Sequence, residues 1–375
     1  MKFTIAYKVF SDALAKCAVV SNKHVTIPIL QNVMVRCDAR NIVFRATDLD
    51  TFVDVACVVG SDMPTTDGAV TFPCHNVAKF MKAAKCDLVE LEASETGITI
   101  RAGLARVSFP TLPIEDFPHP INETWRTVAR PFSLPAADWH TLIGQTQFAI
   151  STEEVQYYLN GVYIHEVSGQ LRFVTTDGRR LAKVETFAAL PTGDYAIPGV
   201  VFPRQAVARL KKIMPKKGDI SVAIAHGNTV LQWGNILFRT KNIDGSFPDY
   251  ERVIPKDNKR VATMSRGELA AMLPRVLTAQ TERSCAVKLA FSRGELTVST
   301  SGPDGGTASE TMAVDWQGEL FEVVFNGKYL GDILAATSGA DVQMFFDEER
   351  GADCSVVLRD PSVNGATFVQ STIRV

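Results

Sequence analysis

Few residues of this 375-residue sequence stand in an arrangement that catalysis or metal binding requires. Cys74 and His75 are an adjacent nucleophile and base, but neighbouring side chains point apart on a strand or a helix. Ser151, Asp48 and Asp177 lie in no motif typical of hydrolases, metalloproteases or nucleotide-binding loops. None of the seven cysteines forms a Cys-x-x-Cys pair, which argues against a zinc cage. We expect no catalytic residue, no metal and no cofactor, and a hydrolase stays as an alternative.

The stretch Thr-Thr-Asp-Gly-Arg-Arg-Leu at residues 175–181 offers a turn with exposed polar groups rather than a catalytic site. Thr-Asp-Gly is typical of a hairpin turn, because glycine accepts a positive φ. Tyr157 and Tyr158 come shortly before it, and two aromatic neighbours favour a cross-strand pair in a sheet. From these residues alone, turn and sheet are sufficient explanations.

These residues belong to a sequence that repeats with a period of about 125 residues. Val-Thr-Phe-Pro at 70–73 matches Val-Val-Phe-Pro 130 residues later, at 200–203, and Val-Val-Phe-Asn follows after another 123 residues, at 323–326. The pair Thr47-Asp48 recurs as Thr176-Asp177. We therefore predict three similar domains, at residues 1–125, 126–253 and 254–375.

The local signals also repeat inside each domain. A short alternating strand leads into a helix that we expect to begin at Ser11, Pro135 or Ser265, and a second helix follows Pro73, Pro203 or Asn326. Alternating runs separated by turns follow each helix. Each domain is thus interpreted as β-α-β-β-β taken twice, mostly antiparallel, with six helices in the chain. This is an α+β fold.

Charge is distributed unevenly over these elements. The 41 acidic and 39 basic residues give a net charge of −2, yet the six helical stretches sum to +11 and the remainder to −13. Lysine and arginine are good helix formers on solvated faces, which is one explanation. The other is a helical layer that faces a polyanion. Without a leader-like N-terminus or a run of ~18 apolar residues, we expect a soluble cytoplasmic protein and no membrane partner.

Together with the repeats and the helix charge, three motifs resemble one family: residues 175–181, Tyr-Tyr-Leu-Asn-Gly at 157–161 and Phe-Pro-Asp-Tyr at 247–250. The sequence is similar to the bacterial DNA sliding clamp, the beta subunit of the replicative DNA polymerase III holoenzyme, from Met1 to Arg374. This resemblance implies a non-catalytic processivity factor of three domains. Two copies would pair head to tail into a ring that encircles duplex DNA. Short peptide motifs would tether DNA polymerase subunits and the clamp loader to it.

The resemblance also implies roles for individual residues. The peptide-binding pocket would comprise Tyr158, Thr176, Gly178, Arg179, Arg180, Leu181, Pro248, Arg252, Val253, Val369, Ile373 and Arg374. In it, Leu181, Pro248 and Val253 would form an apolar floor, while Arg180 and Arg252 would bond the peptide. The DNA-facing residues would be His24, Lys79, Lys82, Tyr157, Arg204, Lys211 and Lys212. The dimer interface would include Val107, Phe109, Thr278 and Ala279.

Four residues depart from the family pattern. His24 and Gln156 replace residues that are usually basic, and Ser371-Thr372 replaces a Met-Pro pair near the C-terminus. Weaker DNA contact and altered peptide affinity are expected. A specialised or divergent clamp paralogue with altered partner choice is therefore an alternative, beside a β-rich interaction scaffold and the hydrolase.

Overall fold

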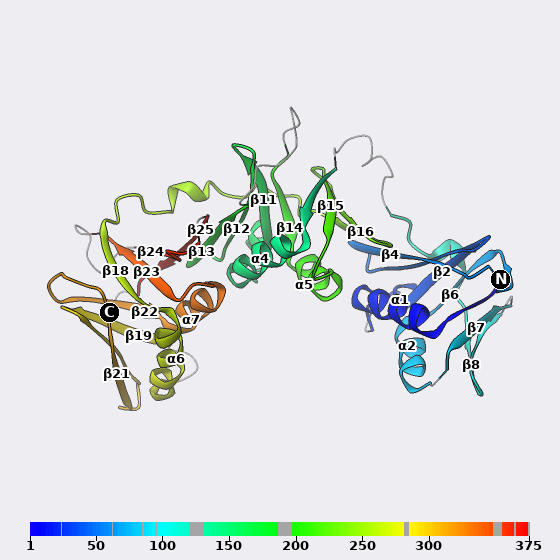
Figure 1. Cartoon of the computed structure of the whole chain (residues 1–375), viewed down its shortest axis with the longest axis horizontal. Coiled ribbons are helices and arrows are strands. Elements are labelled where there is room, and N and C mark those ends of the chain that lie inside the picture. Colours follow the sequence, from blue (N-terminus) through cyan, green and yellow to red (C-terminus); the bar gives the residue numbers. More distant parts are fainter. Residues whose placement is uncertain are drawn as a thin grey trace. The chain divides into compact units, whose positions relative to one another are not determined.

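Figure 1 shows the computed structural model. Its contacts divide the chain into two compact units. The first unit contains residues 1–137 and 205–242, and the second contains residues 138–204 and 243–375. The structure describes residues 1–23, 25–61, 63–84, 86–94, 96–120, 131–186, 197–280, 285–347, 355–363 and 365–373.

The first unit contains two antiparallel sheets, ordered β5-β1-β7-β8-β9 and β10-β15-β16-β17-β4-β3-β2-β6. Its strands are β1 (Lys2–Ala6), β2 (Asn32–Asp38), β3 (Asn41–Thr47), β4 (Thr51–Val58), β5 (Thr65–Thr66), β6 (Gly68–Pro73), β7 (Leu88–Ala93), β8 (Gly97–Ala102), β9 (Ala105–Pro110), β10 (Phe132–Pro135), β15 (Asp219–Ile224), β16 (Asn228–Trp233) and β17 (Ile236–Lys241). Helices α1 (Tyr7–Val20) and α2 (Cys74–Ala83) lie side by side in Figure 1. Helix α5 (Arg204–Ile213) begins at the last residue of the second unit's first segment.

The second unit also contains two antiparallel sheets, ordered β14-β11-β12-β13-β25-β24-β23-β18 and β21-β20-β19-β22. Its strands are β11 (Gly161–Val167), β12 (Gln170–Thr176), β13 (Arg180–Glu185), β14 (Val200–Pro203), β18 (Arg260–Ser265), β19 (Ala286–Ser292), β20 (Glu295–Ser301), β21 (Thr307–Ala313), β22 (Phe321–Asn326), β23 (Asp341–Phe346), β24 (Ser355–Arg359) and β25 (Ala366–Ser371). Its helices are α4 (Ala136–Thr146), which begins in the first unit, α6 (Arg266–Val276) and α7 (Gly327–Ala336). Four short 3-10 helices matter below: η3 (Gln147–Ala149), η4 (Tyr157–Leu159), η5 (Tyr250–Arg252) and η6 (Leu277–Ala279).

The predicted α+β fold, with β-α-β-β-β taken twice in each of three domains, is confirmed. The described residues contain the six expected helices. The two compact units nevertheless divide the middle repeat, because β17 pairs with β4 and β13 pairs with β25. Each half of the middle repeat therefore extends the sheet of a different neighbouring repeat.

Most helix starts were predicted correctly, with one error. Ser265 and Asn326 are N-caps whose side-chain oxygens accept backbone N–H bonds, and α2 begins directly after Pro73. Helix α1, however, begins at Tyr7 rather than at Ser11. Strand β1 ends at Ala6 and leads directly into the helix, so Ser11 lies inside it. Among the described residues no helix is long and apolar enough to span a membrane.

Candidate functional site

The turn between β12 and β13 is built by its own side chains. Thr176 Oγ1 accepts the N–H of Gly178 at 3.1 Å, and Asp177 Oδ1 accepts the N–H groups of Arg179 and Arg180, each at 3.0 Å. Gly178 has φ 81°, a conformation that glycine adopts without strain. The hairpin turn read from Thr-Asp-Gly is thus present, and it fixes where the two arginines begin.

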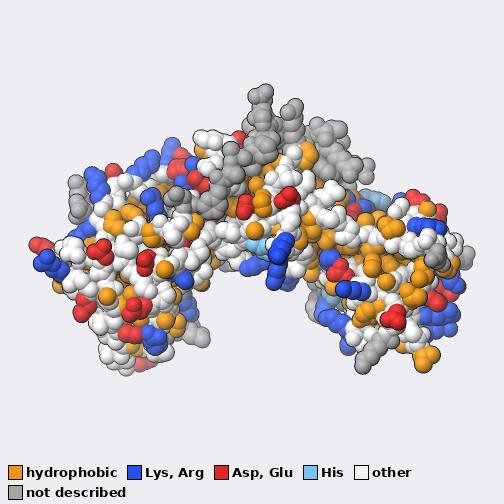
Figure 2. All heavy atoms as spheres, viewed as in Figure 1, with side chains coloured by type: hydrophobic (Ala, Val, Ile, Leu, Met, Phe, Trp, Pro, Cys, Tyr) orange, Lys and Arg blue, Asp and Glu red, His pale blue; other side chains and the backbone are white. Residues whose placement is uncertain are grey.

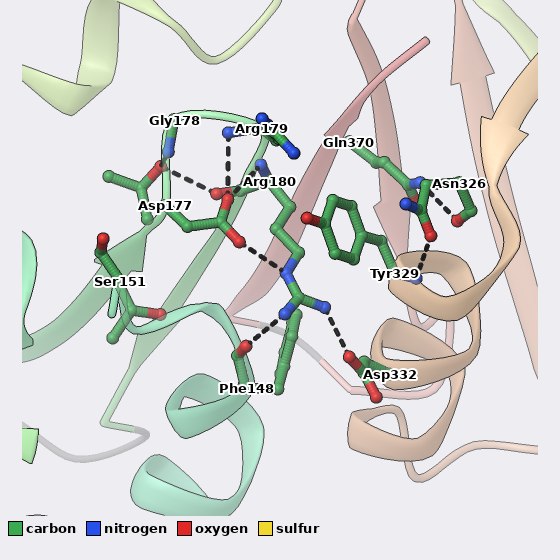
Figure 3. Close-up of polar contacts among 12 residues, drawn as sticks. Phe148, Ser151, Asp177, Gly178, Arg179, Arg180, Asn326, Tyr329, Asp332 and Gln370 are labelled. Atoms are coloured by element: carbon green, nitrogen blue, oxygen red, sulfur yellow. Dashed lines mark hydrogen bonds and ion pairs between the residues drawn. The ribbon is translucent and has the colours of Figure 1, made fainter. Parts of the chain in front are cut away.

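Arg180 joins this turn to helix α7, as Figure 3 shows. Its guanidinium pairs with Asp177 at 3.0 Å and with Asp332 at 2.6 Å, and it donates to the carbonyl of Phe148 at 2.7 Å. It also lies over the Tyr329 ring, 4.2 Å from the centroid. Three of its N–H donors are engaged and its side chain is only 10% exposed, so Arg180 positions the turn, while its contact with a peptide stays a prediction.

A polar cavity of about 870 Å³ lies beside this network. Gly178, Arg179, Arg180, Tyr329 and Arg204 line it, together with residues from η3 and from the loop 151–156. Gln156 is one of these loop residues and is exposed. The Arg179 guanidinium donates a hydrogen bond to the hydroxyl of Tyr329, and this bond raises the pKa of the guanidinium.

Leu181 points into an apolar cluster on the sheet next to the turn. It is buried with Val174, Val369 and Val357, and Tyr250 and Ile254 cover them. The other predicted pocket residues lie at the surface: Pro248 is exposed, the Val253 side chain is exposed, and Arg252 is exposed and pairs with Asp249 at 2.8 Å. The expected apolar floor thus has a buried part, around Leu181, and an exposed rim.

The C-terminal strand contributes to the same surface. Ser371 donates its N–H to the carbonyl of Arg179, and Ile373 donates to the carbonyl of Val324. Between them, Thr372 is partly buried and Ile373 is exposed. Gln370 is buried and donates to the carbonyl of Asn326 at 3.0 Å. Arg374 lies outside the described residues.

The first unit contains an internal comparison for this site. Its turn at residues 47–51 shares two hydrogen bonds with the turn at 176–180, from the N–H of Leu49 to Thr47 Oγ1 and from the N–H of Thr51 to Asp48 Oδ1. Leu49, with φ 84°, stands where Gly178 does. The register then matches Arg45 with Val174 and Arg239 with Val369. In the first unit these two arginines pair with Asp54, each at 2.6 Å. In the first unit a charged cluster therefore occupies the positions that Val174 and Val369 hold in the second unit.

Tyr157 and Tyr158 are not the cross-strand pair that strand propensity favours. They form the 3-10 helix η4, with ring centroids 5.8 Å apart in an edge-to-face contact. Tyr157 is half exposed and Tyr158 is partly buried. Gly245 passes close by, since a Cβ added to it would lie 3.0 Å from the Cβ of Tyr158. Tyr158 therefore lies beside the start of the segment that carries Pro248, Arg252 and Val253.

The predicted DNA-facing cations are exposed on helices. Lys79 and Lys82 on α2 line a cavity of about 530 Å³ between α1 and α2, together with Lys23. Arg204, Lys211 and Lys212 are exposed on α5, and none of these five residues forms an ion pair within the described part of the chain. Figure 2 shows basic and acidic side chains intermixed on the face in view of each unit. His24 lies outside the described residues.

The predicted dimer residues lie near sheet edges. Strand β9 is the last strand of its sheet, with Val107 and Phe109 partly buried. Thr278 and Ala279 belong to η6, a 3-10 helix that follows α6, rather than to a longer α-helix. In the other unit, β21 is the last strand of the four-stranded sheet.

The residues considered for catalysis do not form a catalytic pair. Burial raises the pKa of Cys74 to about 12, so its thiol is protonated at neutral pH. The His75 ring contacts the carbonyl of Ser21 at 2.9 Å. The described residues include no cluster of three His, Cys, Asp or Glu side chains placed to bind a metal. Nothing in this geometry favours the hydrolase.

His165 on β11 is partly buried under residues 247–251. Its Nε2 lies 2.9 Å from the hydroxyl of Tyr250, and its ring stacks on Tyr163 at 4.6 Å. Burial, with a smaller contribution from the Arg172 guanidinium, lowers the pKa of His165 to about 4. These two effects outweigh the carboxylates of Glu251 and Glu185, which raise the pKa. The neutral imidazole is therefore the form that the folded protein holds.

This lowered pKa predicts a loss of stability in mild acid. As the pH falls below 6.5, the unfolded chain binds a proton at His165 before the folded chain does, so the free energy of unfolding decreases until about pH 4. After allowance for partial exposure we expect a loss of about 1–2 kcal/mol. Urea unfolding at pH 7 and pH 4.5 should show this extra loss in the natural chain and not in His165→Gln. An equal loss of unfolding free energy in the natural chain and in His165→Gln would contradict a lowered pKa at His165.

Two residues of this site were not predicted, Asp332 and Tyr329. The repeat contained a signal for Asp332, since it is the sixth residue of α7 and Arg209 is the sixth residue of α5. Arg209 pairs with Asp48 at 2.6 Å, just as Asp332 connects through Arg180 to Asp177. In both units an ion pair therefore connects the turn to the sixth residue of a helix, α5 in the first unit and α7 in the second.

Comparison with known proteins identifies the family to which this fold belongs. The three domain models of the DNA polymerase III beta subunit match the chain: the N-terminal domain at residues 1–121, the central domain at 133–249 and the C-terminal domain at 251–370. The beta sliding clamp of Caulobacter vibrioides is 34% identical over the full length of both chains. Among solved structures, the sliding clamp of Bartonella birtlesii bound to griselimycin matches with a TM-score of 0.92 and 32% identity, and the beta subunit of Pseudomonas aeruginosa with 0.94 and 26%. Both structural matches cover all of each chain.

The fold is thus that of a DNA clamp, three similar domains of twice-repeated β-α-β-β-β units. The chain belongs to the DNA polymerase III beta subunit family.

Proposed function

We propose that the protein is a sliding clamp, a non-catalytic processivity factor that encircles duplex DNA and tethers a replicative polymerase. The observation that carries this proposal is the full-length match to all three domains of the family. The apolar cluster around Leu181, next to the turn at 176–180, supports a peptide site there. DNA polymerase subunits and the clamp loader are the proposed peptide partners. We expect this chain to act in the cytoplasm.

The pocket assignment extends over the predicted residues, with one change of role. Thr176, Gly178 and Arg179 shape the turn, while Leu181, Val369, Pro248 and Val253 supply apolar surface. Arg252 has the exposed guanidinium that suits a peptide carbonyl or carboxylate. Arg180 is assigned to positioning. Griselimycin, which the Bartonella birtlesii clamp binds, is a ready competitor for testing this site.

We propose that the ring is a head-to-tail homodimer. Strand β9, with Val107 and Phe109, would meet the edge of the four-stranded sheet at β21, near Thr278 and Ala279 of the partner. We also propose that each protomer consists of three domains, at residues 1–125, 126–253 and 254–375.

DNA binding by the unloaded protein should be weak, salt-sensitive and independent of sequence. The exposed cations on α2 and α5 have no ion-pair partners in the described structure, so they are available to phosphates, which carry no sequence information. Lys211→Ala/Lys212→Ala should reduce the slope of log K against log salt by about 1–2. Fluorescence anisotropy with two unrelated duplexes, at salt concentrations from about 50 to 200 mM, measures this slope. Tight binding to only one duplex would refute a sliding contact.

The second candidate is a divergent clamp paralogue. Ser371 and Thr372 stand where the family pattern has an apolar pair, and Gln156 lines the polar cavity where a basic residue is usual. Under this reading the fold and ring are unchanged, and partner affinity differs. Comparing affinities for peptides from a replicative and a repair polymerase distinguishes the two.

A further inference from the structure

Residues 244–254, the exit segment between β17 and β18, contain three predicted pocket residues but little regular structure. Their only helical part is η5, of three residues. Pro248, Arg252 and Val253 are exposed, whereas Tyr250 and Ile254 are buried against the sheet. A pocket wall of this kind keeps its shape only if the buried residues anchor it.

Aromatic stacking supplies the first anchor. The Phe247 ring lies parallel to the Tyr163 ring, with centroids 4.8 Å apart and planes at 4°. Tyr163 in turn stacks on His165 at 4.6 Å. Tyr163 and His165 project from the same face of β11, because they are two residues apart on a strand. The stack therefore fixes Phe247, directly before Pro248, onto a rigid sheet.

A polar network supplies the second anchor. Arg172 on β12 donates to the hydroxyl of Tyr250 at 3.3 Å and to Glu251 at 2.9 Å. Since the Tyr250 oxygen accepts from Arg172, its O–H can donate to Nε2 of the neutral His165, 2.9 Å away. Lys183 adds an ion pair to Glu251 at 3.8 Å. These contacts fix the residues directly before Arg252 and Val253.

We propose that Tyr163 and Tyr250 are positioning residues of the peptide pocket, which hold the exit segment in the shape that a peptide binds. The inference rests on the proposed function, since it concerns the same pocket. A wall held in advance does not have to be ordered when the peptide arrives, so its anchors raise affinity without touching the peptide. Loss of an anchor should free the segment locally and weaken binding.

The test compares Tyr163→Ala, Tyr163→Phe and a matched control, Phe321→Ala. Phe321 belongs to a separate aromatic cluster with Phe346, so its loss should cost stability without reaching the exit segment. Two quantities are measured on the full chain. One is the Kd of a fluorescent clamp-binding peptide from the replicative polymerase. The other is the rate of tryptic cleavage after Arg252, which reports local opening of the segment.

We expect Tyr163→Ala to raise Kd about 5–30-fold and to speed cleavage after Arg252 about tenfold or more, as local release of an anchored segment does. Tyr163→Phe keeps the ring and should restore both values, while Phe321→Ala should leave both unchanged. Natural Kd and cleavage in Tyr163→Ala, or an equal effect of Phe321→Ala, would overturn the inference. If the natural chain binds no peptide, the proposed function fails, and cleavage still decides whether Tyr163 holds the segment.

Discussion

Replacing Leu181 by Asp should abolish peptide binding, lowering affinity by more than about 100-fold. Leu181 is 2% exposed and lies in the apolar cluster with Val369, Tyr250 and Ile254. A carboxylate there would be desolvated without a partner, which costs several kcal/mol, and it would remove the apolar surface on which we propose that a peptide residue binds. Isothermal titration of a polymerase-derived peptide measures the effect.

Because Leu181 is buried, this variant tests the fold and the pocket together, so a second variant separates them. The Val253 side chain is 57% exposed, and Val253→Asp should therefore weaken binding with little change in stability. In the opposite direction, Ser371→Met/Thr372→Pro should tighten binding about 5–30-fold, because an apolar side chain and a rigid ring return to the wall. Natural affinity in both Asp variants would show that the pocket lies elsewhere.

Replacing Arg180 by Met should lower the free energy of unfolding by about 2–4 kcal/mol. The change removes ion pairs to Asp177 and Asp332, the bond to the Phe148 carbonyl and the stacking on Tyr329. It leaves Asp177, whose side chain is 18% exposed, without its guanidinium. The loss stays below that of a fully buried pair, because Asp332 is half exposed and water can solvate it.

Urea unfolding of a double-mutant cycle checks this account. Asp332→Asn alone should cost at most about 1 kcal/mol, as an exposed partner does. Asp177→Asn should cost less in the Arg180→Met background than in the natural chain, since the partner is already gone. Additive losses would mean that Arg180 and Asp177 do not depend on each other.

The order of elements was predictable because its signals are local and repeated. Pro73 and Asn326 are helix-start residues on sequence grounds, and the structure places helices directly after both. Ser11 was misleading because a capping residue is equally compatible with a helix interior, and the chain before it continues from strand to helix without a break.

The site was predictable only in part, because its contacts are distant in sequence. The turn at 176–180 follows from Thr-Asp-Gly. Arg180 and Asp332 are 152 residues apart, and no local pattern tells whether an arginine faces a partner helix or a ligand. Tyr157 and Tyr158 have strand propensity, yet their backbone forms a 3-10 turn, since tertiary context overrides propensity.

Retention on circular DNA tests the central claim most directly. The protein, loaded by a clamp loader onto a nicked circular plasmid, is separated from unbound chains by gel filtration, and half of the complex is linearised with a restriction enzyme. Because a closed ring is held by topology and only weakly by phosphate contacts, we predict that a dimer of the 41.0 kDa chain stays on the circle and is lost from the linear form. Equal retention on both forms, or loss from both with only a monomer in solution, would contradict the account.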